Sequence, residues 1–167
     1  QLNKHSDDAN AVQALPQVYT ILQQKHLKNI EKYNNSTDLG RWDKIASAYK
    51  SLQSMYEAID NSSAASGLMK PVNYEKEIAA VKESAAEDHY QTGLAYFEKN
   101  NRETARKAYT HFKKADAWVK DYKDAKAKMN EAFENSIVLV QINPVQDNSF
   151  FFNTGWGNYG YNYSNEY

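Results

Sequence analysis

Histidines and paired carboxylates are the side chains in this sequence that could perform acid–base or metal chemistry. The chain has four histidines, and two of them, His26 and His89, fall beside apolar positions that recur with helical spacing. A His-Glu-x-x-His pattern, which places two zinc ligands and a base on one helix face, does not occur. We therefore interpret His26 and His89 as hydrogen-bonded histidines between helices, rather than as a metal ligand or a catalytic base.

The carboxylates, the glycines and the absence of cysteine likewise give no indication of catalysis or metal binding. The carboxylate pairs lie near lysines, at predicted helix starts or on polar faces, where they complement the helix dipole: Glu75 and Glu77, Asp121 and Asp124, and Glu131 and Glu134. The segment 155–157 lacks the lysine and the following helix of a phosphate-binding loop. The chain has no cysteine, so thiolate catalysis and cysteine-ligated metals are excluded. We expect no enzyme activity, no metal and no cofactor.

The elements that carry these side chains are predicted to be helices. Apolar residues recur at intervals of three and four over residues 15–33 and again over 42–59, which is the period of one helix face. Between them, residues 34–40 are polar and end in a glycine, so they break the first helix and cap the second. An antiparallel hairpin follows. Residues 61–67 then end the second helix.

Three more helices are predicted downstream. The third runs from Tyr74 to Lys99 with Asn73 as its cap, and it is long enough to bridge two hairpins. The fourth runs from Glu103 to Val119. Asp121 caps a short fifth helix whose inward-facing residues are Tyr122, Ala125, Met129 and Phe133. The sequence therefore predicts an all-α domain of about five helices, arranged in antiparallel hairpins, over residues 1–135.

A small residue and an aromatic residue on the third predicted helix are followed by a small–aromatic–small ridge on the fourth. These positions are Gly93, Tyr96, Ala108, Phe112 and Ala115. Their order resembles a tetratricopeptide repeat, in which the two helices of a hairpin interlock through such residues. The resemblance implies a module that holds a protein or peptide partner and performs no catalysis.

A second copy of the ridge lies 60 residues earlier. Ile45, Ala48, Tyr49, Leu52 and Met55 align with Ala105, Ala108, Tyr109, Phe112 and Ala115. Both stretches are therefore predicted to be second helices of hairpins. If the use of the tetratricopeptide family carries over with its fold, the first helix of the second hairpin presents a partner-binding face, formed by Glu87, Gln91, Leu94 and Glu98.

The composition changes at residue 136. Residues 136–145 are uncharged and rich in β-branched side chains, which predicts one strand. A lone strand leaves its backbone groups unsatisfied, so we expect it to pair with a second copy or to dock on the helices. Residues 147–167 are rich in aromatics, asparagines and glycines. We interpret 136–167 as the start of a further β region that continues beyond Tyr167, with a disordered adhesive segment as the alternative.

Four aromatic residues in this tail are candidates for a contact surface: Trp156, Tyr159, Tyr161 and Tyr163. The alternation at 159, 161 and 163 would place three rings on one face of a strand, which suits a sheet contact or a platform for stacking sugars. We favour the sheet contact. No lysine or arginine follows Lys128, so the tail lacks the basic groove of a single-strand binder, and no nucleic-acid partner is predicted.

The overall amino-acid composition, rich in Asn, Tyr and Lys, resembles that of the helical-repeat regions of secreted bacterial envelope lipoproteins. The resemblance implies a periplasmic or outer-membrane-associated location and a lipid anchor upstream of Gln1. No apolar run reaches the roughly 18 residues of a membrane helix. The sequence therefore leaves two functions open. The first is a non-enzymatic protein-interaction or scaffolding module of a bacterial cell-envelope protein, and the alternative is a glycan-binding or adhesive surface on the aromatic tail.

Overall fold

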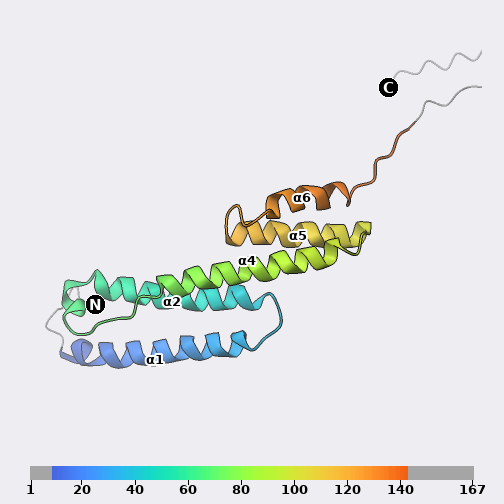
Figure 1. The fold of residues 1–167 in the computed structure, drawn as a ribbon. Helices are drawn as coiled ribbons and strands as arrows, with labels where there is room; N and C mark the ends of the chain where they lie inside the picture. Colours follow the sequence, from blue (N-terminus) through green and yellow to red (C-terminus); the bar gives the residue numbers. More distant parts are fainter. Residues whose placement is uncertain (1–8, 143–167) are drawn as a thin grey trace, which may run out of the picture. The chain divides into compact units, whose positions relative to one another are not determined.

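The computed structural model describes residues 9–142 of the 167-residue chain, and all regular structure in that range is helical. The helices are α1 (Ala9–Asn34), α2 (Arg41–Asp60), α3 (Ser63–Ser66), α4 (Glu75–Phe97), α5 (Arg102–Trp118) and α6 (Ala125–Glu134), as Figure 1 shows. The chain divides after Ile137 into two units, and the six helices belong to the first. The predicted all-α class is thus confirmed for these residues. None of the six helices is long and apolar enough to cross a membrane.

Helices α1 and α2 form the first hairpin, and their ribbons run side by side in Figure 1. Its core consists of aliphatic side chains from both helices, including Ile30, Ile45 and Leu52. Tyr74, the residue before α4, and Val81 of α4 complete this core. Burial of such side chains removes apolar surface from water at about 25 cal/mol per Å², which is what holds two amphipathic helices together.

Helices α4 and α5 form the second hairpin, and α6 packs on α5. Its core surrounds Phe112, which is fully buried, and contains mostly small side chains from α5 and α6: Ala108, Ala115, Ala125 and Ala132. Tyr90 of α4 lies against the Phe112 ring, with 5.8 Å between the ring centroids. Helix α4 therefore contributes its first half to one core and its second half to the other, so it bridges the two hairpins as the sequence predicts.

Gly93 sets how closely α4 and α5 approach. A Cβ atom at this position would lie 2.7 Å from Cε1 and 2.8 Å from Cδ1 of Phe112, which is closer than a side chain tolerates. The absence of a side chain at Gly93 therefore makes room for the ring. The residue pair that led to the repeat interpretation is thus a direct contact between α4 and α5.

The two aligned ridges have similar burial. Ile45, Ala48 and Leu52 are buried in α2, and their counterparts Ala105, Ala108 and Phe112 are buried in α5. The aligned tyrosines, at positions 49 and 109, are both half-buried. The fifth aligned pair differs, because Met55 is half-buried and Ala115 is fully buried.

The connection from α3 to α4 is tied to the first hairpin by hydrogen bonds. The backbone N–H of Val72 donates to the Tyr19 hydroxyl at 3.1 Å, and the N–H of Tyr74 donates to Oε1 of Gln53 at 2.8 Å. Gln23 donates from Nε2 to the Tyr74 hydroxyl at 2.8 Å. These bonds satisfy polar groups in a segment that has no regular structure, and they fix the start of α4.

The helix ends differ from the predictions at three places. Asn73 was predicted to cap the third helix, but the residue directly before α4 is Tyr74, and Asn73 accepts a hydrogen bond from Glu75 N–H. Residues 61–67, predicted as a break, contain the one-turn helix α3, which Ser62 caps by accepting a hydrogen bond from Ala65 N–H. Asp121 was predicted to cap the last helix, but it has a left-handed backbone (φ 57°) and its N–H binds Asp116. The residue before α6 is Asp124, whose carboxylate accepts from the Tyr90 hydroxyl and raises the pKa of Tyr90 to about 12.

Phe133 was predicted to face inward, but it is 51% exposed, and Ala132 occupies the buried position of α6 instead. The predicted strand over 136–145 is described only as far as Ile142, and residues 137–142 form no strand there. These residues are largely solvent-accessible, with Leu139 at 89%. Residues 143–145 lie outside the described range.

Candidate functional site: a groove across α1, α2, α4 and α5

Two neighbouring pockets of the first unit have one residue in common. The α1–α2 pocket encloses about 320 Å³, and the α2–α4–α5 pocket encloses about 330 Å³. Asp43, in the first turn of α2, lines both pockets. The two pockets therefore both border Asp43, and we refer to them together as the Asp43 groove.

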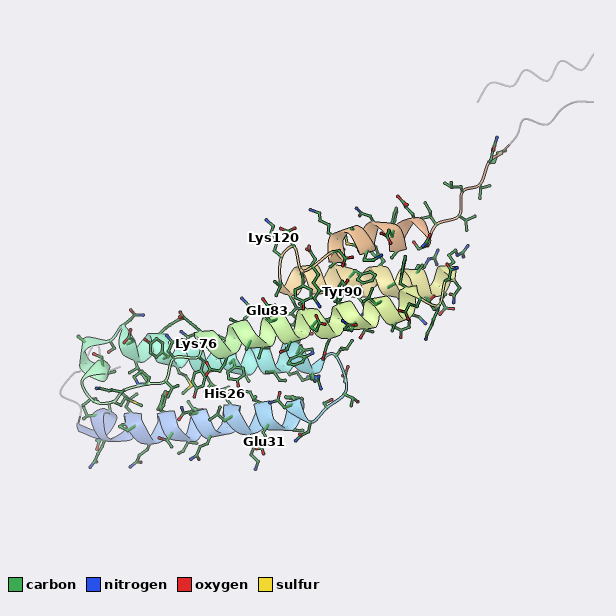
Figure 2. The ribbon with its side chains drawn as sticks, in the orientation of Figure 1. His26, Glu31, Lys76, Glu83, Tyr90 and Lys120 are labelled. Carbon is green, nitrogen blue, oxygen red and sulfur yellow. The ribbon has the colours of Figure 1, made fainter. Side chains whose placement is uncertain are left out.

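The α1–α2 pocket combines an aromatic ring, a cation and hydroxyl groups. His26, Asn29 and Tyr33 line it from α1, and Lys44, Ser47 and Ser51 line it from α2. Nζ of Lys44 lies 5.5 Å from the centroid of the Tyr33 ring, a cation–π distance. His26, labelled in Figure 2, is half-buried beside these groups. His26 lies at a pocket between α1 and α2, but the hydrogen bond predicted for it is not formed within residues 9–142.

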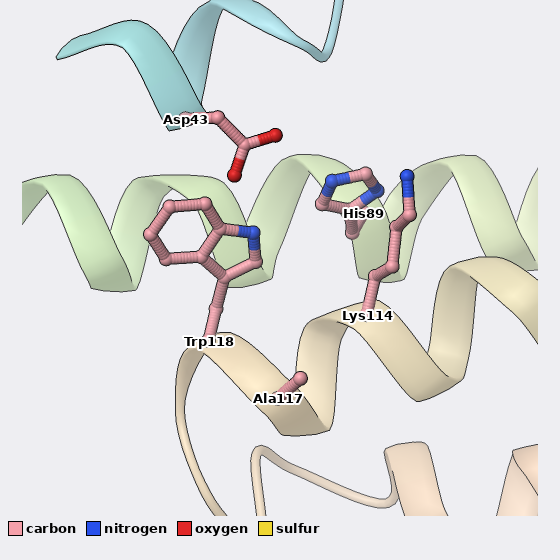
Figure 3. Close-up of a pocket in the computed structure, with 5 residues that line it drawn as sticks. All are labelled: Asp43, His89, Lys114, Ala117 and Trp118. Atoms are coloured by element: carbon pink, nitrogen blue, oxygen red, sulfur yellow. The ribbon is translucent and has the colours of Figure 1, made fainter. Parts of the chain in front are cut away.

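The α2–α4–α5 pocket has walls of opposite charge. Asp43 projects from α2, His89 from α4, and Lys114, Ala117 and Trp118 from α5 (Figure 3). Asp43 and Lys114 are exposed, and within residues 9–142 neither side chain forms an ion pair or a hydrogen bond. The pocket therefore presents one free carboxylate and one free ammonium group.

His89 is the buried polar group of this pocket, with 3% of its surface exposed. Its Nδ1 lies 3.1 Å from Nδ1 of His111, so one ring donates a proton and the other accepts it. Burial, His111 and Lys114 lower the pKa of His89 to about 4, although Asp43 and Asp88 act in the opposite direction. His89 is therefore neutral at pH 7. The His111 ring in turn stacks on Tyr96, with 5.5 Å between centroids.

A second set of bonds fixes the start of α2 on α4. Arg41 Nη2 donates to Oδ2 of Asp88 at 2.8 Å, and Trp42 Nε1 donates to the same oxygen at 2.9 Å. Arg41 also binds the carbonyl of Ser36 and stacks over the Trp42 ring at 4.6 Å. Asp43 follows these two anchored residues directly, so the network holds the shared wall of the groove in place.

The partner-binding face predicted on α4 lies elsewhere. At 100° per residue, Glu87 is 200° around the helix from His89, so the predicted face and the pocket are on opposite sides of α4. Glu87 accepts hydrogen bonds from Tyr122, Lys123 and Gln91, and these donors lower its pKa to about 2.

The other members of the predicted face divide between core and solvent. Leu94 packs against the core of the second hairpin, whereas Gln91 and Glu98 are exposed. The contact of Glu87 with Tyr122 and Lys123 means that the connection between α5 and α6 covers one end of this face. Its use by a partner stays a prediction.

The second predicted surface cannot be placed. Trp156, Tyr159, Tyr161 and Tyr163 lie outside the described residues. Within residues 9–142, no group of three or more histidine or carboxylate side chains is arranged to hold a metal ion.

Sequence reasoning identified His89 as a histidine between helices but did not identify the other walls of its pocket. The sequence gives no reason to assign Asp43 to a site, because its interaction with the helix dipole already accounts for a carboxylate in the first turn of a helix. For the α5 wall of the pocket, the sequence does carry a signal. His111, Lys114 and Trp118 recur at intervals of three and four, which places a cation and two rings along one helix face beside the buried ridge.

Comparison with protein-family models finds no match for this chain, and comparisons with curated proteins and with solved structures find no significant one. The function is therefore argued from the geometry of the groove.

Proposed function

We propose that this protein is a non-enzymatic protein-interaction or scaffolding module of a bacterial cell-envelope protein, and that it holds an extended segment of a protein partner in the Asp43 groove. The observation that carries the proposal is the double role of Asp43, which lines both pockets. A groove that crosses several helices offers contacts along a chain, whereas a single pocket would offer one.

The side chains of the groove suit a polypeptide ligand. Asn29 and Ser47 supply hydrogen-bonding groups for peptide N–H and C=O groups, and Tyr33 and Trp118 supply ring surface for side chains. Tyrosine and tryptophan are enriched in protein interfaces because they combine large contact area with a polar tip. Lys44 and Lys114 add positive charge at the two pockets, which favours a partner segment with acidic residues.

The cell-envelope assignment and the lipid anchor upstream of Gln1 rest on the resemblance to envelope lipoproteins in composition. The envelope location is tested directly by fractionating cells that produce the protein and locating it by immunoblot. Recovery in the membrane or periplasmic fraction is expected, and recovery with the cytoplasmic proteins would contradict this part of the proposal.

Partner recovery by tagged variants tests the groove. Reversal of both cations, Lys44→Glu with Lys114→Glu, is expected to reduce recovery of the partner at least tenfold, because two attractive contacts become repulsive. The matched control is Lys50→Glu with Lys113→Glu, which makes the same change of net charge at exposed lysines of α2 and α5 outside both pockets. A control variant that recovers as little partner as the double reversal would show that net charge, and not the groove, decides binding.

The same experiment compares the groove with the face predicted on α4. Charge reversal of Glu98 alters that face without touching the groove, and we expect it to leave recovery within about twofold of the unaltered protein. Loss of the partner with this variant, and retention with the Lys44 and Lys114 reversal, would reject the groove in favour of the α4 face. Melting temperatures measured for each variant separate binding from folding.

A further inference from the structure

We propose that the α2–α4–α5 pocket is a binding site for a free α-amino acid with an apolar side chain, taken up as its zwitterion. Three features of the pocket carry this inference: two unpaired charges of opposite sign, a buried imidazole and an indole wall. The inference rests on the pocket alone and does not require the proposed protein partner.

The charges define the class of ligand. Asp43 on α2 and Lys114 on α5 lie on either side of His89 in Figure 3, and neither has a partner among residues 9–142. A ligand with a single charge would be attracted to one of these two side chains and repelled by the other. A ligand with an ammonium and a carboxylate on one carbon satisfies both at once, with its ammonium toward Asp43 and its carboxylate toward Lys114.

His89 adds a directional hydrogen bond. Its Nδ1 is engaged by His111, so Nε2 is the ring atom left to bind a ligand in the pocket that the residue lines. When His89 accepts at Nδ1, its Nε2 carries the proton and donates to a carboxylate, and when His89 donates at Nδ1, its Nε2 accepts from an ammonium, so either tautomer can bind one end of the zwitterion. The ring is neutral at pH 7 because its pKa is lowered, so it binds without cancelling the charge of Asp43.

The size and the remaining walls fit an amino acid. The volume of about 330 Å³ lies near the lower end of the range of small-molecule pockets, which is roughly 300–1,000 Å³. Trp118 and Ala117 provide an apolar wall for a side chain, and Trp118 also packs against the core of the first hairpin. The indole is therefore held in place before a ligand arrives, which reduces the entropy lost on binding.

Three related compounds test recognition of the zwitterion. L-Phenylalanine is titrated into the ¹⁵N-labelled full chain while the indole N–H of Trp118 and the amide N–H of Ala117 are followed. We expect a saturable shift with L-phenylalanine. The response should be at least fivefold weaker with N-acetyl-L-phenylalanine, which lacks the ammonium, and with L-phenylalaninamide, which lacks the carboxylate. No saturable shift with L-phenylalanine, or equal binding of all three compounds, would overturn the proposal.

Variants of the two charged walls provide the second test. Asp43→Asn and Lys114→Gln should each weaken L-phenylalanine binding about fivefold, whereas the matched control Lys113→Gln should leave it unchanged. Unchanged affinity in the Asp43 and Lys114 variants would also overturn the proposal. Partner recovery is measured separately on the same proteins, so a failure of amino-acid binding is distinguishable from a failure of the interaction proposed above.

Discussion

The two hairpins bury equivalent faces with different side chains. In the first hairpin, aliphatic residues such as Ile45 and Leu52 fill the space between α1, α2 and the start of α4. In the second, the fully buried ring of Phe112 packs on alanines, on the rings of Tyr90 and Phe97, and against Gly93. The first hairpin distributes its contacts over many similar side chains, whereas the second depends on one ring and the space made for it.

This difference predicts where each hairpin tolerates change. A core of similar aliphatic side chains can repack when one member is altered, because its neighbours differ little in volume. Removal of a ring that packs on alanines leaves a large cavity, since Ala108 and Ala115 have no side-chain freedom and the neighbouring rings of Tyr90 and Phe97 are rigid. The second hairpin should therefore be the more sensitive of the two to substitutions in its core.

The largest effect is expected at Phe112. Phe112→Ala should reduce the free energy of unfolding by about 3–5 kcal/mol, because it removes a fully buried ring and leaves a cavity. Leu52→Ala, the aligned substitution in the first hairpin, should cost less, about 2–4 kcal/mol. Denaturant unfolding followed by circular dichroism measures both. An unchanged midpoint for Phe112→Ala would show that the ring is not buried, and equal losses would remove the difference between the hairpins.

A smaller effect is expected at Gly93. Gly93→Ala adds a Cβ that would lie 2.7 Å from the Phe112 ring, so α4 and α5 must separate or the ring must move. We expect a loss of about 1–3 kcal/mol by overpacking, which exceeds the gain of about 1 kcal/mol that alanine brings to a helix. Gly67→Ala is the control, because a Cβ there meets nothing within 4 Å. In thermal unfolding, Gly93→Ala should lower the melting temperature and Gly67→Ala should not. A higher melting temperature for Gly93→Ala would refute the close contact.

An effect that appears only at low pH is expected at His89, on α4. Its pKa is lowered from 6.5 to about 4 in the folded protein, so the unfolded chain binds a proton between these values and the folded chain does not. The resulting stability is present above pH 6.5 and is lost as the pH falls toward 4.

His89→Gln should remove this pH dependence. Between pH 7 and 4 the unaltered protein is expected to lose roughly 1–3 kcal/mol more than the variant, measured by urea unfolding across that range. The groups that face His89, which are His111, Lys114, Asp43 and Asp88, remain in both proteins, so the comparison isolates the imidazole. Parallel pH profiles would contradict the buried, neutral state of His89.

The sequence predicted the long helices because a period of three and four is a property of each segment alone. Residues 42–59 and 103–119 carry such stripes, and α2 and α5 occupy nearly those ranges. The order of small and aromatic residues also indicated the contact of Gly93 with Phe112. That contact is visible in the sequence because close approach of two helices requires a residue without a side chain.

The remaining features depend on how elements meet. The Asp43 groove combines side chains from α1, α2, α4 and α5, and no periodicity within one helix reports on that combination. Phe133 was assigned to the interior from its spacing, but a rotation of α6 places Ala132 there instead. Asp121 was assigned as a cap because it precedes an apolar stripe, yet its backbone adopts a left-handed turn that a sequence does not specify for aspartate.

Site-specific photo-crosslinking tests the proposed groove most directly. A photoreactive residue is placed at Ser47, within the groove, and in a second protein at Glu98, on the opposite-facing surface predicted for α4. We expect a crosslinked partner from position 47 and none from position 98, and we expect the adduct to disappear when Lys44→Glu and Lys114→Glu are added. An adduct from position 98 alone, or one from position 47 that survives both charge reversals, would contradict the proposal that the Asp43 groove holds the partner.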